Sequence, residues 1–394
     1  MDTQIVLIIL GIIILIIVIF IVIRKGNIKN DNDDNDDNDD DKVNGGVNRV
    51  TNRVTNRVTN VGYKRNPSNF MMNTSLQTVY AKHSIIPITD GMKAKKIIFM
   101  PSAYDLINYE ISLMQKTKGN YYYIINDIDL LVGKDFLWDR LDRYYRNDVT
   151  KLSPKSYIPR DSLSLERLKK DYKNGRLYIA KKNVQRQEGI QIINDKDELF
   201  KLMTDKEVAI IQELLQDPMT ISGHKINLRV YVLIVIYKDD CNIYVYNDGF
   251  MYYTPKKFVS NSIDKDVNIT TGYIDREIYE SNPLTHKDFM EYLEDDGPRI
   301  KNNILNLIKN VLKPYTKLFV DKQAFRGSVQ YQIMGADVAI DDKGKAMIME
   351  VNKGPDLGGK DERDTKLKLS LVEHMLEIVG VLPMSESNEF IKVN

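Results

Sequence analysis

Residues 337–352 place two carboxylates and an amide on a hairpin that is otherwise apolar. Two short apolar strands flank a polar, glycine-containing turn at residues 342–345, which is a typical hairpin signal. Side chains alternate between the faces of a strand, so Glu350 and Asn352 share one face. A turn centred on its two middle residues places Asp337 opposite Glu350. This feature requires a fold in which the polar face meets either a cation or solvent.

Like charges at this separation repel each other unless a cation lies between them. Carboxylate and amide oxygens are hard ligands, of the kind that suits Mg²⁺ carrying phosphates. The alternative is a polar face turned toward solvent. The hairpin alone does not decide between this alternative and a metal site at Asp337, Glu350 and Asn352. The decision depends on the rest of the chain.

The size and charge of the chain restrict its class. With 394 residues it has room for two or three domains or for one large domain. Its hydrophobic content of 43% and charged content of 28% are ordinary for a globular core with a solvated surface. A net charge of +1 gives no support for a nucleic-acid partner, and none is expected. The single cysteine, Cys241, fits a reducing compartment.

After a short cap at residues 1–4, residues 5–23 form an uncharged, aliphatic run that can just cross the hydrocarbon core of a bilayer. A cleaved signal peptide fits less well, because the start is acidic and no A-x-A-like cleavage site follows. We therefore expect a transmembrane anchor. Arg24 and Lys25 follow it, and the positive-inside rule then predicts a single-pass membrane protein whose catalytic domain is cytoplasmic.

Residues 24–95 are predicted to form a low-complexity, disordered tether. Residues 31–41 contain only Asp and Asn and cannot bury apolar surface. An Asn-Arg-Val-Thr repeat follows, with arginines at Arg49, Arg53 and Arg57. Its two interpretations are a plain linker and a basic patch for acidic lipid or an acidic protein tail.

Ordered patterning is expected to begin near residue 96, and residues 96–165 are predicted to form a small α/β lobe. Apolar strands are then predicted at residues 177–181, 190–193, 208–215 and 226–237. Amphipathic helices are predicted at 298–312 and from Leu367 onward. The last residues, 386–394, are treated as a tail.

Basic side chains stand on or between these strands. Lys181 ends one strand, and Arg186 follows in a polar loop that could fold over phosphates or be a plain exposed hairpin. The strand at 208–215 offers a backbone edge suited to an adenine. Lys225 and Arg229 share a face of a later strand and suit an anionic ligand. The lysine would act as a point charge, and the planar guanidinium of the arginine would donate two parallel hydrogen bonds.

The chain has neither a G-x-x-x-x-G-K-[ST] nor a G-x-G-x-x-G motif, so neither a P-loop nor a Rossmann phosphate site is indicated. Cations on one sheet and a carboxylate cluster on another suggest a nucleotide clasped between two antiparallel sheets. The fold class is therefore α/β (α+β).

Two stretches of the chain resemble signatures of the tubulin-tyrosine ligase family over roughly residues 120–380. They are IQELLQDP at 211–218 followed by GHKINLRVYVL at 223–233, and GADVAID at 335–341 followed by IMEVNKGP at 348–355. Weaker matches lie at 178–190, 134–135 and 247–250. The resemblance implies an ATP-grasp fold over residues 166–385. It also implies an enzyme that uses ATP and Mg²⁺ to join a free amino acid to a protein acceptor, possibly tubulin.

The resemblance also assigns roles by position. Lys181 would contact the α- and β-phosphates, and Lys225 would reach the nucleotide. Arg186 would contact ATP from the basic loop that follows Lys181. Arg229 would contact the γ-phosphate and an acyl-phosphate intermediate. The adenine edge would be lined by Gln212, Glu213 and Leu215, and the Mg²⁺ ligands would be Asp337, Glu350 and Asn352.

The chain departs from the family pattern in its amino-acid half. Asn227, within the nucleotide site, stands where the family usually has Asp, and Tyr252 replaces an arginine that helps to hold the substrate amino acid. A His-Leu-Thr-Asn-like motif is reduced to residues 268–271. The amino acid and the acceptor therefore stay open. So do two alternatives: a ligase acting on a small-molecule or lipid-linked amine, and a non-catalytic membrane-tethered binding protein.

Overall fold

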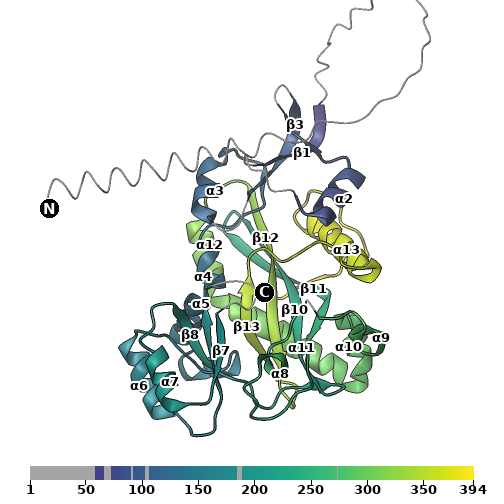
Figure 1. Ribbon diagram of the computed structural model, residues 1–394. Helices are drawn as coiled ribbons and strands as arrows, with labels where there is room; N and C mark the ends of the chain where they lie inside the picture. Colours follow the sequence, from purple (N-terminus) through teal and green to yellow (C-terminus); the bar gives the residue numbers. More distant parts are fainter. Residues whose placement is uncertain (1–57, 66–71, 90–91, 103–105, 184–188, 273) are drawn as a thin grey trace, which may run out of the picture. The chain divides into compact units, whose positions relative to one another are not determined.

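The structure is a computed structural model that describes residues 58–65, 72–89, 92–102, 106–183, 189–272 and 274–394 (Figure 1). The predicted anchor at 5–23, the acidic run, the arginine repeat and Arg186 lie outside the described residues. Among the helices that the structure describes, none is both long and apolar enough to span a bilayer.

A ten-stranded mixed sheet forms the larger layer of the fold. Strand β12 is central: it pairs antiparallel with β10 and β13 and parallel with β4. The order is β14 (Phe390–Lys392), β11 (Asp240–Tyr253), β10 (His224–Tyr237), β12 (Val329–Ile340), β4 (Tyr121–Tyr122), β3 (Lys93–Met100), β1 (Val58–Arg65) and β2 (Ile86–Pro87), with β13 (Ala346–Asn352) on β12 and β9 (Thr220–Ile221) on β10.

A second, smaller sheet is wholly antiparallel. Its order is β5 (Ser156–Tyr157), β8 (Val208–Glu213), β6 (Tyr178–Lys182) and β7 (Ile190–Ile193). Helices α6 (Ser162–Asp171) and α7 (Lys196–Leu202) cover one of its faces through a core that includes Leu168, Leu199 and Ile211. The opposite face is thereby left for the site described below.

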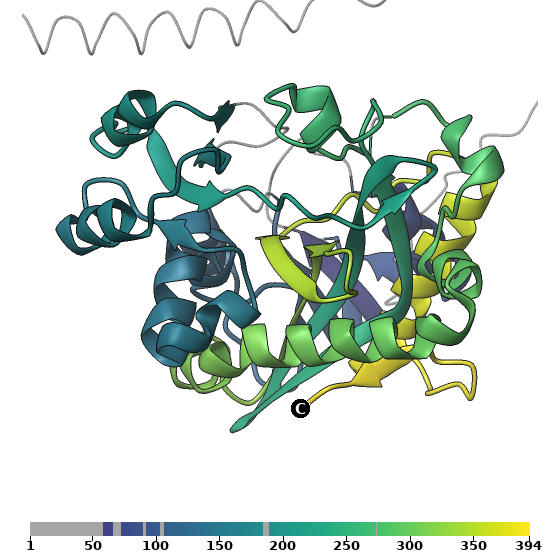
Figure 2. The same cartoon turned by 90° about the horizontal axis from the view of Figure 1, so that it is seen from below.

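Helices support the large sheet from both ends of the chain. Helix α11 (Gly297–Leu312) buries Ile300, Ile304 and Ile308, in agreement with the helical spacing of apolar residues predicted at 298–312. In Figure 2 this helix runs across the long strands of the sheet. Helix α13 (Glu362–Ile378) packs against α2 (Thr74–Lys82). The other helices are α3 (Ile107–Leu113), α4 (Asp129–Val132), α5 (Lys134–Tyr145), α8 (Lys265–Asn268), α9 (Ile278–Ser281), α10 (His286–Tyr292) and α12 (Thr316–Lys322).

The structure corrects the predicted boundaries at both ends. Strand β1, helix α2 and strand β2 lie within residues 58–95, which the sequence assigned to the tether. Strand β1 is stabilised by parallel pairing with β3, about thirty residues further along the chain, and such non-local pairing leaves little local signal. The predicted tail at 386–394 contains β14, which pairs with β11. The predicted boundary at 165/166 falls inside α6.

The predicted pair of antiparallel sheets is correct for the small sheet and wrong for the large one. The strands β1, β3 and β4 join β12 in parallel, so the predicted N-terminal lobe continues the large sheet. The two-sheet α/β architecture nevertheless fits the ATP-grasp-like fold that the resemblance implies.

Candidate active site

The uncovered face of the small sheet, the hairpin β12–β13 and the start of α5 converge on one point of the fold. A small cavity there is lined from all three: Lys181, Ile210 and Gln212 come from the small sheet, Met349 from β13, and Lys134 and Trp138 from α5. Residues that are far apart in the sequence are therefore brought together by the packing of two sheets.

Lys181 is the cation that the small sheet contributes. Its side chain is buried, and its Nζ donates to Oε1 of Gln212 at 3.0 Å. The Gln212 amide is fixed in turn, because its Nε2 donates to Oγ of Ser156 at 2.9 Å. Burial lowers the pKa of Lys181 to about 8, although Glu350 acts in the opposite direction. Because water does not stabilise the positive charge of this buried lysine, an anionic ligand beside its Nζ would do so.

Strand β10 supplies the second group of cations. Lys225, Asn227 and Arg229 alternate with the buried Ile226 and Leu228 and so share one face of the strand. Lys225 is only 3% exposed, and burial together with the charge of Lys181 lowers its pKa to about 8. The two lysines therefore lie close enough to repel each other, which favours a bound anion between them.

The β12–β13 hairpin places Asp337 opposite Glu350, as the sequence predicts, but by a different route. The turn spans five residues, because the last regular pair is Ile340 with Ala346. The pairing of Val338 with Ile348 would continue to Met349. A β-bulge at Met349 instead shifts the register by one residue, and Asp337 pairs with Glu350.

The two carboxylates of the hairpin are neutralised by cations of the chain itself. Nε and Nη2 of Arg229 donate to Oδ1 and Oδ2 of Asp337 at 2.6 and 3.1 Å. Nζ of Lys134 lies 3.6 Å from Oε2 of Glu350. Burial raises the pKa of Asp337 to about 6, against the opposing effect of Arg229. Burial also opposes the charge of Glu350, but Lys134 and Lys181 hold its pKa below the usual value.

Asp337, Glu350 and Asn352 fit a hard divalent cation in number and kind of donor. Nδ2 of Asn352 lies 3.4 Å from both Oδ2 of Asp337 and Oε1 of Glu350, so the three side chains face one point. Within the described part of the chain, no three histidine, cysteine or acidic side chains gather in this way. The third protein ligand would thus be the Asn352 amide, turned so that its oxygen faces the two carboxylates.

On its other side Arg229 is enclosed by Tyr252 and Gly335. The guanidinium carbon of Arg229 lies 5.2 Å from the centre of the Tyr252 ring, a cation–π distance. A Cβ on Gly335 would lie 2.8 Å from Cδ of Arg229, so the glycine provides the space for this side chain. Tyr252 also lies beside Gly272, which directly follows residues 268–271, the segment that replaces the expected family motif.

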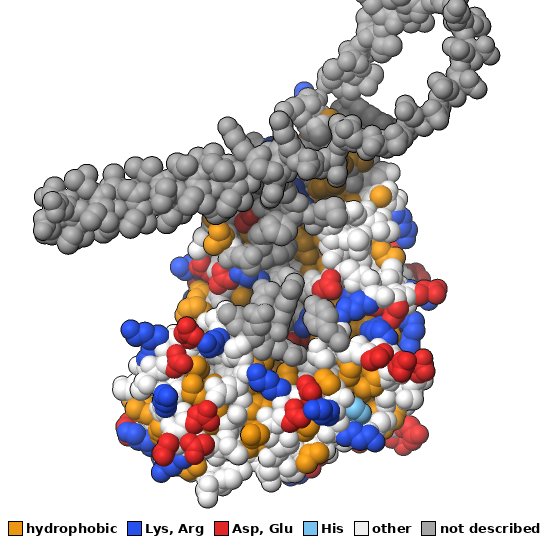
Figure 3. Space-filling model, in the orientation of Figure 1, with side chains coloured by type: hydrophobic (Ala, Val, Ile, Leu, Met, Phe, Trp, Pro, Cys, Tyr) orange, Lys and Arg blue, Asp and Glu red, His pale blue; other side chains and the backbone are white. Residues whose placement is uncertain are grey.

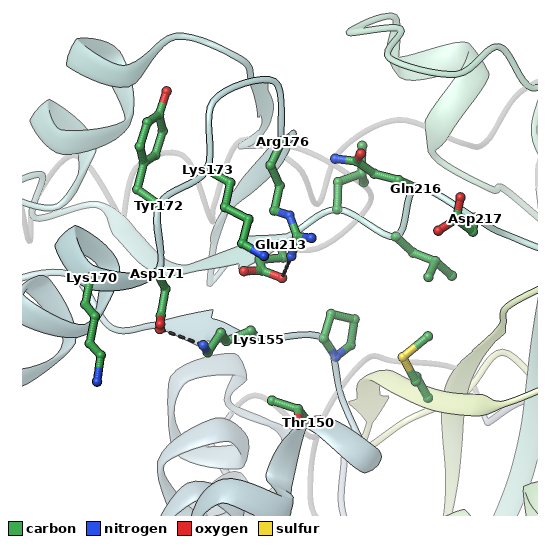
Figure 4. Close-up of a pocket in the computed structure, with 14 residues that line it drawn as sticks. Thr150, Lys155, Lys170, Asp171, Tyr172, Lys173, Arg176, Glu213, Gln216 and Asp217 are labelled. Carbon is green, nitrogen blue, oxygen red and sulfur yellow. Dashed lines mark hydrogen bonds and ion pairs between the residues drawn. The ribbon is translucent and has the colours of Figure 1, made fainter.

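A larger pocket of about 560 Å³ opens beside the end of β8 (Figure 4). Glu213 and Leu215 line it, and Glu213 pairs there with Arg176, while Lys155 pairs with Asp171 at 2.7 Å. Gln212 lines the small cavity beside Lys181 instead. The three predicted adenine-edge residues therefore divide between two cavities, because successive side chains of a strand point to opposite faces.

The predicted residues that the structure brings together are Lys181, Gln212, Lys225, Asn227, Arg229, Asp337, Glu350 and Asn352. Lys134 is not among the predicted site residues, although residues 134–135 match the family weakly. Its position at the start of α5 beside Glu350 identifies it. Tyr252 was noted as a departure, but its stacking on Arg229 had no sequence signal.

Comparison with known proteins gives a consistent result. A model of the "Tubulin-tyrosine ligase family" matches residues 119–389. "Probable tubulin polyglutamylase TTLL9" of Rattus norvegicus is 29% identical over 187 residues, which cover 44% of this chain and 39% of the relative. "Tubulin monoglutamylase TTLL4" of Mus musculus is 25% identical over 279 residues, which cover 64% of this chain and 23% of the relative. "Tubulin polyglutamylase TTLL7" of Homo sapiens is 22% identical over 241 residues, which cover 55% of this chain and 27% of the relative. The chain thus spans less than half the length of each of these relatives.

Proposed function

The chain belongs to the tubulin-tyrosine ligase family, and on that premise we propose that it is an ATP- and Mg²⁺-dependent ligase that joins an amino acid to a protein acceptor. The observation that carries the proposal is the meeting of two buried lysines, Lys181 and Lys225, and the partly buried Arg229 with the paired carboxylates Asp337 and Glu350. The cations suit the phosphates of a nucleotide, and the carboxylates suit a divalent metal ion.

Each group has a chemical task in this proposal. Lys181 and Lys225 hold phosphate oxygens as point charges, and Arg229 offers a planar fork to the transferred phosphoryl group. Asp337, Glu350 and Asn352 would hold Mg²⁺, which when bound neutralises charge on the phosphates. Lys134 offsets the charge of Glu350 in the free protein and becomes available to the nucleotide once a metal takes its place.

We propose for these groups the two-step reaction that the family resemblance implies. A substrate carboxylate oxygen attacks the γ-phosphorus, the bond from that phosphorus to the β–γ bridging oxygen breaks, and ADP leaves with the electron pair. An amine then attacks the acyl-phosphate carbon, loses a proton, and expels inorganic phosphate as the amide forms. Arg229 stabilises the phosphoryl group in the first step and the leaving phosphate in the second. Burial of the cations excludes the water that would hydrolyse the intermediate.

The relatives indicate which substrates to test first. Three of them are named for glutamylation of tubulin, which makes glutamate the first amino acid and tubulin the first acceptor. Tyr252 stands where the family has an arginine that helps to hold the amino acid. We therefore expect this chain to bind its amino acid with a different set of contacts from its relatives.

The apolar run at 5–23 adds a proposal about location. It would anchor the protein in a membrane with the ligase on the cytoplasmic side, where ATP and tubulin are available. Acceptors close to a membrane would then be modified in preference to distant ones.

The test is transfer of labelled amino acids to tubulin by the full chain with ATP and Mg²⁺. We expect label from one or a few amino acids, glutamate first, with one ADP released per residue joined. Glu350→Gln should abolish transfer, and Glu207→Gln, an exposed carboxylate paired with Lys182, is the matched control that should keep it. Absence of transfer with every standard amino acid, or full activity of Glu350→Gln, contradicts the proposal.

A further inference from the structure

Helix α3 carries an apolar stripe that faces outward. Leu106, at its N-cap, is 65% exposed, Tyr109 is 59% exposed and Leu113 is 47% exposed. The spacing of three and four residues puts these side chains on one face of the helix, while Ile107 and Ile111 are buried on the other. A short helix with two apolar faces needs a second partner besides its own core.

Lysines surround the end of this helix. Lys116 and Lys118 follow it directly, and both are exposed. Nζ of Lys96 lies 5.5 Å from the centre of the Tyr121 ring, and Oδ1 of Asn120 accepts a hydrogen bond from the backbone N–H of Ile97 at 2.8 Å. The segment that carries Lys116 and Lys118 and follows α3 is thereby held against β3, beside Lys96.

The same part of the chain is strongly basic. Residues 58–122 contain eight Lys and Arg against three Asp and Glu, a net charge of +5, whereas the whole chain has a net charge of +1. Over the lower half of the view in Figure 3, by contrast, basic and acidic side chains are interspersed. A positive, apolar surface is complementary to an acidic lipid bilayer, where leucines enter the interface and tyrosine and lysine remain at the headgroups.

The N-terminal sequence brings such a surface within reach. The structure's first strand, β1, starts at Val58 and pairs with β3, which precedes α3. Only the 34 residues 24–57 separate it from the apolar run at 5–23. Fully extended, 34 residues reach about 110 Å at most, so a chain anchored by that run cannot carry β1 further than this from the bilayer.

We propose that Leu106, Tyr109 and Leu113, with Lys96, Lys116 and Lys118 around them, form a second membrane contact that rests on an acidic lipid surface. The inference relies on the proposed anchor only to bring the membrane close, and it is independent of the ligase activity. Its consequence is orientation: the ligase would be held by a face as well as by its covalent link to residues 5–23, so its cleft would point in one direction from the membrane.

The test uses the full chain reconstituted in vesicles, with an environment-sensitive fluorophore on Tyr109→Cys. Cys241, the single natural cysteine, is buried and serves as the unlabelled background. A probe on Tyr292→Cys, also an exposed tyrosine, is the matched control on α10. In vesicles with 30% phosphatidylserine we expect a blue-shifted probe at 109 that a lipid-borne quencher reaches, and no change at 292. Vesicles of pure phosphatidylcholine should reduce the signal at 109 at least threefold.

A second variant separates the face from the anchor. Leu113→Asp should abolish the signal at 109 without releasing the protein from the vesicles. Leu163→Asp, which changes an even more exposed leucine on α6, should leave the signal intact. Flotation with neutral vesicles tests the anchor alone. Equal probe signals at 109 and 292 in acidic vesicles overturn the proposal. So does a blue shift at 109 that appears without lipid and grows with protein concentration, which would assign the face to a second copy.

Discussion

Arg229 and Asp337 lie on neighbouring strands in register and form a two-point ion pair, with 2.6 Å from Nε to Oδ1 and 3.1 Å from Nη2 to Oδ2. Both side chains are 15% exposed, so the pair is weakly screened by solvent. Both oxygens of a predicted metal ligand are thus occupied by a predicted phosphate ligand. Binding of Mg²⁺ and nucleotide must redistribute these partners, which couples the two binding events.

The first prediction follows from that coupling. Mg²⁺ alone should bind weakly to the wild-type protein, because it has to displace Arg229 from Asp337. Arg229→Gln should increase the affinity for a divalent cation without nucleotide at least fivefold, although it abolishes ligase activity. It should also destabilise the protein by about 2–3 kcal/mol, since Asp337 is left without its cation. Titration with Mn²⁺ by electron paramagnetic resonance and thermal unfolding measure the two effects.

A matched control for this experiment is Arg143→Gln, which removes an exposed arginine paired with Asp139. It should change neither cation affinity nor activity, and it should leave stability close to that of the wild type, because an exposed ion pair is screened by solvent. If Arg229→Gln binds Mn²⁺ no better than the wild type, Asp337 is not a ligand that Arg229 holds in reserve.

Lys181→Met gives the second prediction, a loss of ATP binding without a loss of stability. The lysine is desolvated in the free protein, so replacing it by an apolar side chain of similar length should leave the melting temperature unchanged or slightly raised. ATP affinity should fall by at least a hundredfold, because a charge-assisted contact to phosphate is lost. Calorimetric titration with ATP measures the affinity.

Its control lies next to it in the sequence. Lys182 is paired with Glu207 at the surface, and Lys182→Met should retain ATP binding within a factor of two. A Lys181→Met protein that binds ATP normally would remove the small sheet from the nucleotide site.

The third prediction concerns pH. Burial lowers the pKa of Lys181 and of Lys225 to about 8, and only the protonated lysine attracts phosphate. ATP affinity should therefore be full below about pH 7 and fall as the pH rises through 8, by about tenfold per lysine between pH 7 and 9. Lys225→Met should halve the slope of log affinity against pH.

The same two pKa values give stability the opposite dependence. Between pH 8 and 10.5 the unfolded chain holds protons that the folded chain has released, so the free energy of unfolding should increase with pH in this window. Urea unfolding at pH 7.5 and 9.5 measures the difference. ATP affinity and stability that change in the same direction would contradict the assignment of both effects to these lysines.

The site was predictable from sequence where the pattern is local. The strands that carry Lys181 and Arg229 have clear apolar runs, and α11 has a clear helical period, so all three elements form close to where they were expected. The facing of Asp337 and Glu350 was also predicted, but the turn is longer than assumed and a bulge at Met349 compensates for it. Bulges leave no signal in a hydrophobic pattern.

Features that depend on distant partners were missed. Strand β1 opens with Val-Thr-Asn, which continues the Asn-Arg-Val-Thr repeat before it, and takes its stability from pairing with β3 and β2, so its start resembles the low-complexity region. Strand β14 is three residues long and is defined only by β11. Lys134 enters the site because α5 packs beside β13, a contact between segments more than 200 residues apart.

Gly335 gives the last prediction. Because a Cβ at this position would lie 2.8 Å from Cδ of Arg229, Gly335→Ala should push the guanidinium away from Asp337. Alanine suits a strand better than glycine does, which offsets part of the cost of loosening the Arg229–Asp337 pair, so we expect a loss of stability smaller than that of Arg229→Gln. Ligase activity should nevertheless fall at least tenfold.

Gly175→Ala is the counterpart that separates strain from site geometry. Gly175 has φ +79°, and no atom lies within 4 Å of the position that a Cβ would occupy there. Alanine at this position should therefore cost about 1 kcal/mol of stability and leave activity intact. The double variant Gly335→Ala with Arg229→Gln should bind Mn²⁺ as tightly as Arg229→Gln alone, because the methyl group acts only through the arginine. A further change of Mn²⁺ affinity in the double variant would mean that Gly335 serves the site in another way, through the backbone that pairs with Asn352.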